Sequence, residues 1–256
     1  PWQVYWCAGA GVTTTAQHLL ESETSSFRAL LGALRDANAA AGSVFVASSA
    51  GGIYAGSAAP PFDEFSTPAP VAPYGRLKLA SEEIADEWAR ITGAKVFIGR
   101  LSNVYGPGQN IDKPQGLISQ MLRAHLSRVP LRVYVPLDTM RDYLYVSDAA
   151  RIIVDGMERL GQPGTASWVT KVVASQQAFS LAAVVGELGR ILRRRPQMIM
   201  ATSPVARLQA KDLRLRSRVW PELDRSPTTP VPVGIHATVE DIEARLQEGT
   251  LTPEAH

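Results

Sequence analysis

Short apolar runs alternate with helically spaced apolar residues along the amino-terminal part of the chain. Three apolar runs predict strands at residues 2–8, Ser43–Ala47 and Lys95–Gly99. Between them, apolar residues recur at the spacing of one helix face and predict helices over Ser22–Asn38 and Tyr74–Thr92. This order of strands and helices is typical of an α/β fold, in which helices cover both faces of a parallel sheet.

The hydrophobic periodicity is weaker in the remainder of the chain. We expect the following elements there: a helix at 116–127, a strand at Arg132–Val135, a helix at Ser147–Leu160, a strand at Lys171–Ala174, a helix at Ser180–Leu192, a strand at Gln197–Met200 and a last helix that starts at Thr238. Ser180 and Thr238 are assigned as helix starts because their hydroxyls can accept hydrogen bonds from the first turn.

Composition indicates a globular protein and argues against several classes of partner. Of the 256 residues, 45% are hydrophobic and 20% are charged, and the net charge of +2 is too small to indicate a nucleic-acid partner. No apolar run approaches the roughly 20 residues that a membrane helix needs. The one cysteine, Cys7, cannot form an internal disulfide, which suits a reducing cytoplasm. The four histidines have no ligand spacing, so no metal site is predicted.

An acid/base pair stands at the start of the second predicted helix. Tyr74 and Lys78 are four residues apart, so their side chains lie on one face, one turn apart. A nearby ammonium favours the phenolate form of a tyrosine, and the helix N-terminus at Pro73 acts in the same direction. The same spacing also occurs by chance on helix surfaces, so its meaning depends on the neighbouring segments.

Three loops are expected at one edge of the sheet, where α/β proteins bind their ligands. They are Gly9–Gly11, the turn Ser48–Tyr54 and the segment from Arg100 onward. Glycines let a ligand approach the backbone closely. Tight packing of a helix on a strand explains Gly9 and Gly11 almost as well.

Four segments, in their order and spacing, resemble the extended short-chain dehydrogenase/reductases. Within that group they resemble the nucleotide-sugar epimerases and dehydratases of the NAD-dependent epimerase/dehydratase family. The segments are Ser48–Tyr54, Pro73–Lys78, Arg100–Gly108 and Arg141–Asp148. The resemblance extends over almost the whole chain. It implies a Rossmann-type, doubly wound parallel sheet with a smaller carboxyl-terminal substrate-binding α/β lobe. The implied division is 1–106 and 142–175 for the NAD(P)-binding domain, and 107–141 and 176–256 for the lobe.

The resemblance also implies how the cofactor and the reacting hydroxyl are bound. Tyr74 would be the general acid/base on a substrate hydroxyl, and Lys78 would tune it and bind the ribose of the cofactor. Gly9, Ser48 and Arg100 would line the cofactor as well. The implied cofactor is NAD, with NADP not excluded.

Three residues match positions that contact the nucleotide sugar in similar enzymes. Asn103 could hydrogen-bond a phosphate or sugar oxygen, Arg141 could clamp a diphosphate with two parallel bonds, and Gly51 would lie against the sugar. The alternatives are a structural ion pair between Arg141 and Asp142, and a turn-stabilising role for Asn103.

The sequence departs from the family pattern at the active hydroxyl. The positions that usually hold the active Ser or Thr are Ala50, Gly51 and Gly52, and none of them has a hydroxyl. Ser49 is the nearest substitute and Ser48 the next. A site without this hydrogen bond would lose about 100-fold or more in rate, by analogy with other positioned donors.

The same turn favours one reaction of the family over another. Similar dehydratases have an acidic residue there, whereas this chain has Gly51 and Gly52. The sequence therefore favours epimerisation by transient oxidation at a sugar carbon. The alternatives are an NAD(P)H-dependent reductase of a keto sugar or another carbonyl, and a non-catalytic family member that binds a nucleotide.

Two further expectations concern the extent and assembly of the chain. The family's Gly-x-x-Gly-x-x-Gly loop has no counterpart, so we expect that on the order of 60 residues of strand and helix precede this segment in a complete enzyme. Similar proteins form homodimers through the helices that correspond to 22–38 and 74–92. The stripe Phe27, Leu30, Leu31 and Leu34 suits such a contact, and it would also suit packing on the protein's own sheet.

Overall fold

The computed structural model describes residues 2–9, 11–12, 15, 17–36, 42–111, 113, 115–194, 196–203 and 208–250. Its elements are β1 (Trp2–Trp6), α1 (Gln17–Asp36), β2 (Gly42–Ser49), α2 (Ala50–Ile53), α3 (Pro73–Thr92), β3 (Lys95–Leu101), β4 (Asn103–Tyr105), α4 (Leu117–Leu126), β5 (Leu131–Val133), β6 (Met140–Tyr145), α5 (Val146–Gly161), β7 (Trp168–Val173), β8 (Ala178–Ser180), α6 (Leu181–Ile191), β9 (Met198–Met200), β10 (Asp212–Leu213), the 3-10 helix η3 (Pro221–Asp224) and α7 (Val231–Gln247).

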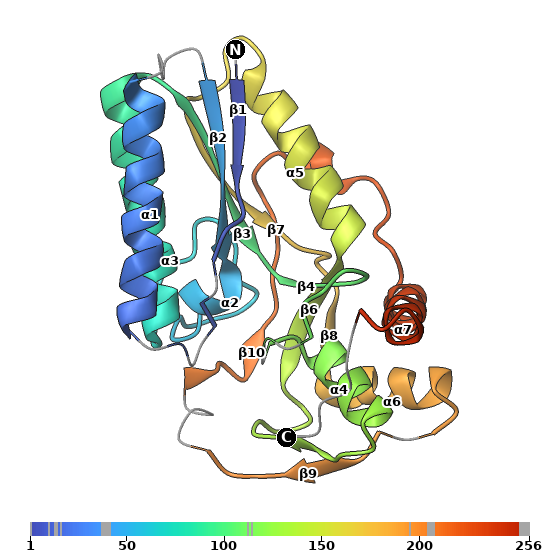
Figure 1. The fold of residues 1–256 in the computed structure, drawn as a ribbon. Coiled ribbons are helices and arrows are strands. Elements are labelled where there is room, and N and C mark those ends of the chain that lie inside the picture. Colours follow the sequence, from blue (N-terminus) through green and yellow to red (C-terminus); the bar gives the residue numbers. More distant parts are fainter. Residues whose placement is uncertain are drawn as a thin grey trace.

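The main sheet is parallel and has the strand order β1-β2-β3-β7. Figure 1 shows α1 and α3 on one face of this sheet and α5 on the other. Successive side chains of a strand point to opposite faces, so Val44 and Val46 pack with α1 and α3 while Phe45 packs with α5. The α/β fold with a parallel sheet is therefore confirmed.

Most of the other elements, among them β4–β6, α4, α6, α7 and β8–β10, lie beyond the carboxyl ends of the main sheet, in the lower part of Figure 1, whereas η3 packs beside α5. A second sheet has the order β10-β6-β4, with β8 antiparallel to β6, and β5 pairs with β9. Met121 of α4, Val184 of α6 and Ile235 of α7 are completely buried in a shared apolar cluster. The assignment of residue ranges to a cofactor domain and a substrate lobe stays a prediction.

One expectation for the later elements is wrong, and one strand was not anticipated. The last helix begins at Val231, because Pro230 and Pro232 are compatible with a helix start. Thr238 is buried inside α7, where its hydroxyl donates to the carbonyl of Gly234 instead of capping a first turn. Strand β6 occupies Met140–Tyr145, where the sequence pattern indicated only a segment before a helix. Residues 37–38 of the first expected helix lie outside the described residues.

The apolar stripe on α1 faces the protein's own sheet. Phe27 and Leu31 are 1% and 3% exposed and pack in one cluster with β2, β3 and α3. Leu34 packs against the same cluster. The stripe is thus used within the chain and gives no separate support to the homodimer, which stays a prediction.

A buried lysine fastens the carboxyl-terminal part of the chain to the main sheet. Lys171 of β7 is fully buried, and its ammonium lies 2.6 Å from Ser217 Oγ, 2.8 Å from the carbonyl of Val219 and 2.7 Å from Asp224 Oδ2. Glu64 also accepts from Ser217 Oγ. These contacts hold the segment after β10 against β7.

Replacing this lysine should destabilise the fold strongly. Lys171→Met leaves the Asp224 carboxylate without its buried partner, so we expect the free energy of unfolding to fall by about 3–5 kcal/mol. Urea denaturation measures the change. Lys211→Met is the matched control, because Lys211 and Asp138 form a pair at 68% and 64% side-chain exposure, and it should change stability little. Equal effects of the two substitutions would contradict the role given to Lys171.

Candidate active site

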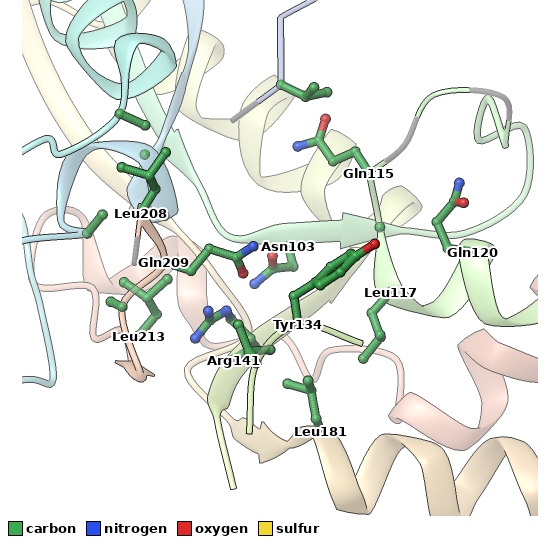
Figure 2. A pocket seen from close by; sticks show the side chains of 18 of the residues that line it. Asn103, Gln115, Leu117, Gln120, Tyr134, Arg141, Leu181, Leu208, Gln209 and Leu213 are labelled. Atoms are coloured by element: carbon green, nitrogen blue, oxygen red, sulfur yellow. The ribbon is translucent and has the colours of Figure 1, made fainter. Parts of the chain in front are cut away.

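A cavity of about 400 Å³ lies between the end of the main sheet and the smaller sheets. Its wall includes Ser49, Gly51 and Gly52 from the turn after β2, and Tyr74 from α3. Asn103 of β4, Tyr134 after β5 and Arg141 of β6 also line it (Figure 2). The segment 208–213 lies next to the turn, since a Cβ on Gly51 would be 3.6 Å from Leu213. Residues of α3, of the turn after β2 and of the smaller sheets therefore line one cavity. It lies at the sheet edge where the sequence predicts a ligand.

Tyr74 and Lys78 lie one turn apart on α3, which begins at Pro73 and ends before Gly93. Tyr74 lines the cavity, whereas Lys78 lies behind it at 7% exposure. The Lys78 ammonium lies 5.7 Å from the centre of the Tyr74 ring. A phenol at the cavity wall with an ammonium at its back is an arrangement suited to proton transfer.

A carboxylate that the sequence analysis did not single out completes this group. Glu23 of α1 accepts a hydrogen bond from the Lys78 ammonium at 2.9 Å, and the two side chains are 10% and 8% exposed. Gly9 has a φ of +152°, and a Cβ on it would lie 2.8 Å from Glu23 Oε1. A side chain at position 9 would therefore crowd the Glu23 carboxylate, while a Cβ on Gly11 would lie 3.1 Å from the Tyr74 ring.

The turn after β2 forms the short helix α2 and packs tightly on α3. A Cβ on Gly75 would lie 2.1 Å from the carbonyl oxygen of Gly52, so the two backbones touch. Ser49 caps α2, because its Oγ accepts from the N–H of Gly52 at 3.1 Å, which leaves its own O–H free to donate. A Cβ on Gly51 would meet only Leu213, at 3.6 Å.

Ser48 and Arg100 do not line the cavity, because their polar groups bind other side chains of the protein, and their expected contact with a cofactor stays a prediction. Ser48 Oγ donates to Glu82 Oε1 at 2.5 Å. Arg100 donates to both Glu82 oxygens, and at 2.6 Å to the hydroxyl of Tyr54. Strand alternation explains the placement, because Ser48 shares its face with Val46, which packs under α1 and α3.

This buried group fixes the turn relative to α3. Glu82 belongs to α3, Arg100 to β3, and Tyr54 immediately follows α2. Burial, opposed by the neighbouring Arg100, raises the pKa of Tyr54 to about 12, so its hydroxyl stays protonated. That hydroxyl donates to the carbonyl of Asp63 at 2.7 Å. Three elements around the cavity are thus joined by one network.

Asn103 and Arg141 both line the cavity, and their side chains lie close together in Figure 2. The Asn103 amide donates to the carbonyl of Asp142 at 2.8 Å, which leaves its oxygen available to a ligand. Arg141 is 8% exposed, and burial lowers its pKa. It forms no ion pair with any described residue, because the Asp142 carboxylate binds the backbone and hydroxyl of Ser175 instead. The alternative of an Arg141–Asp142 ion pair is therefore wrong.

Several cavity residues were not anticipated. Tyr134, which is 42% exposed, follows β5, and Gln115, Leu208 and Gln209 face the same space in Figure 2. Gln115, Leu208 and Gln209 come from loops that carry no periodic pattern. Only the fold brings these loops to the sheet edge.

Metal-binding and membrane-spanning features were searched for in the part of the chain that the structure describes. It holds no group of three His, Cys, Asp or Glu side chains that could bind a metal ion. None of its helices combines the length and apolar character that crossing a membrane requires.

Comparisons with known proteins show which family and which enzymes the chain is similar to. A family model described as "NAD dependent epimerase/dehydratase family" matches residues 2–166. A "Probable dTDP-glucose 4,6-dehydratase" of Sinorhizobium fredii is 42% identical over 106 residues, which are 40% of this chain and 28% of that protein. The matches span between 25% and 37% of the lengths of the first three curated relatives.

Solved structures share the fold over most of the chain. The UDP-glucose 4-epimerase of Thermotoga maritima with UDP-glucose has a TM-score of 0.83 at 20% identity, covering 95% of this chain and 78% of that one. MoeE5 in complex with UDP-glucose and NAD has a TM-score of 0.82 at 25% identity, covering 95% of this chain and 80% of that one.

Because of the contact between Gly52 and Gly75, alanine at position 75 should destabilise the protein, although alanine usually stabilises a helix. Alanine normally stabilises a helix interior by about 0.5–1 kcal/mol relative to glycine. Gly75→Ala should instead lower the free energy of unfolding by about 1–3 kcal/mol, because the new methyl collides with the Gly52 carbonyl. Gly32→Ala on α1 is the control, since its methyl meets nothing within 4 Å. Chemical denaturation that shows both variants stabilised would refute the contact.

Proposed function

The chain belongs to the NAD-dependent epimerase/dehydratase family, and we propose that it is an NAD-dependent epimerase that acts on a nucleotide sugar through transient oxidation at a sugar carbon. The observation that carries this proposal is the cavity that Tyr74 of α3 and Arg141 of β6 share. A phenol can transfer a proton, and a buried guanidinium can bind a diphosphate. One cavity therefore offers both groups that the reaction needs.

Tyr74 is assigned the proton transfer. As a phenolate it takes the proton of a sugar hydroxyl while the carbon is oxidised, and it returns the proton after the keto sugar has turned over in the cavity. The O–H of Ser49 is assigned to the same sugar oxygen, since the Ser49 oxygen already accepts the N–H of Gly52. Ser49 thereby replaces the hydroxyl that positions 50–52 lack.

The residues behind Tyr74 fit the nicotinamide end of the cofactor. Lys78 donates to Glu23, and two of its three N–H groups are left for ribose hydroxyls. NAD, when bound, supplies the hydride acceptor and donor. Lys78 is the described side chain that we assign to the cofactor.

The nucleotide is assigned to the side of the cavity formed by β5 and β6. Arg141, with Asn103 beside it, would bind the diphosphate, and the exposed ring of Tyr134 offers the base a flat apolar face. Arg132 also lines the cavity and adds positive charge. Gly51 leaves room for the sugar next to the turn.

The cavity lining favours epimerisation over dehydration. Loss of water from a sugar needs a further acid/base group beside the tyrosine, commonly a carboxylate. Among the described residues that line the cavity there is neither Asp nor Glu. This supports epimerisation by hydride transfer without loss of water, the reaction that Gly51 and Gly52 favour.

Tyr74→Phe should abolish the reaction without preventing binding. Removal of the phenol O–H should lower the rate of nucleotide-sugar interconversion by about 100-fold or more, because general acid/base catalysis contributes about that much. The protein is incubated with UDP-, GDP- and dTDP-sugars, and product sugars are separated and quantified. Tyr5→Phe is the control, because Tyr5 is 41% exposed on β1 and does not line the cavity.

The same incubation separates the proposal from its alternatives. An epimerase interconverts sugars with no net change in the absorbance of the reduced nicotinamide. A steady loss of that absorbance with added NADPH or NADH would overturn the epimerase in favour of a reductase. Nucleotide binding without either reaction, unchanged in Tyr74→Phe, would favour a non-catalytic member.

Arg141→Gln should weaken binding of the phosphate part of the ligand. The loss of a charge-assisted pair should raise the Kd for UDP-glucose and UDP by roughly 10- to 100-fold. Binding of uridine, which has no phosphate, should not change. Titration calorimetry measures both, with Arg90→Gln as control because the Arg90 side chain is 71% exposed on α3. Equal losses for UDP and uridine would contradict the assignment.

A further inference from the structure

The carboxylate of Glu23 is turned inward against the acid/base pair, unlike the other acidic residues of its helix. Helix α1 has three acidic residues, Glu21, Glu23 and Asp36, and only Glu23 is not exposed. Its Oε1 lies 2.9 Å from the Lys78 ammonium. A pair that is about nine-tenths buried has lost most of its water, so each charge depends on the other.

We propose that Glu23 is a positioning residue for the reaction: its carboxylate fixes the Lys78 ammonium beside Tyr74 and balances its positive charge. This inference rests on the proposed acid/base role of Tyr74. With the pair intact, the phenol faces an ammonium and a carboxylate whose charges cancel. With a neutral residue at position 23, the ammonium would act alone and favour the phenolate. Glu23 therefore determines the net charge that lies behind the Tyr74 phenol.

Among the described residues, few other titratable groups lie near the Glu23–Lys78 pair. Lys113, in the loop before α4, donates to the carbonyl of Gly9 at 3.2 Å. Burial lowers the pKa of Lys113, which Glu23 opposes and Lys78 reinforces, so these three charges interact. Cys7 follows β1, and burial raises the pKa of its thiol while Lys78 opposes that change. Helix α2 has no titratable side chain.

Glu82 cannot take the place of Glu23 as partner of Lys78. It lies one turn further along α3, at a spacing where a lysine and a glutamate commonly pair. Both of its oxygens are already occupied by Arg100, and Ser48 donates to one of them. The ammonium of Lys78 therefore finds its counter-charge on the neighbouring helix α1.

The test is the pH dependence of Glu23→Gln, which keeps the shape of the side chain and removes its charge. The acidic limb of the pH–rate profile for sugar interconversion should move to lower pH by about one unit. Glu21→Gln is the matched control, because it removes the same charge from an exposed position two residues away on α1. Glu23→Asp keeps the charge and should return the limb toward its original position. Circular dichroism verifies the fold of each variant.

A second readout does not require turnover. Tyrosinate absorbance is followed against pH in Glu23→Gln and in the parent, each compared with its Tyr74→Phe version to isolate Tyr74. The Tyr74 phenolate should appear at lower pH in Glu23→Gln. Coincident titrations of the parent, Glu21→Gln and Glu23→Gln would overturn the inference. If no sugar is interconverted, the proposed function fails, and this titration still decides the role of Glu23.

Discussion

The site depends on the direct contact between the backbones of Gly52 and Gly75. A Cβ at position 75 would lie 2.1 Å from the Gly52 carbonyl oxygen, so only glycine allows the first turn of α3 to rest on the turn after β2. That contact brings Tyr74 into the same cavity wall as Ser49. Gly52 suits the same contact, because a Cβ on it would lie 3.2 Å from Gly75 Cα and 3.3 Å from the Tyr74 ring.

Helix α3 carries two inward charges one turn apart, and their pairing follows from geometry. Glu82 is satisfied by the planar fork of Arg100, which contacts both of its oxygens. Lys78 must then find another counter-charge, and it finds Glu23. The Arg100–Glu82 pair joins β3 to α3, and the Lys78–Glu23 pair joins α1 to α3 behind Tyr74. The residues proposed for acid/base chemistry, Tyr74 and Lys78, thus lie where two helices pack together.

Hydrophobic periodicity in the sequence predicted most of the helices and strands, but it was not enough to place several site side chains. Alternation along β2 and β3 could have shown that Ser48 and Arg100 share a face with Val46 and Ile98 under the helices. Glu23 could not have been found, because nothing in its sequence neighbourhood distinguishes it from an exposed helix residue such as Glu21. Its role depends on a contact 55 residues away along the chain.

Alternation along β6 determines the charge of the cavity. Arg141 points into it, while Asp142 points to the opposite side and binds Ser175, so the two neighbours cannot neutralise each other. Arg141 is 8% exposed and forms no ion pair with any described residue, although Asp212 of the neighbouring strand β10 lies near enough to oppose the lowering of its pKa. Under the proposed function, the negative charge of the ligand would give this buried guanidinium a direct partner. A ligand that binds only the folded chain would also stabilise that chain.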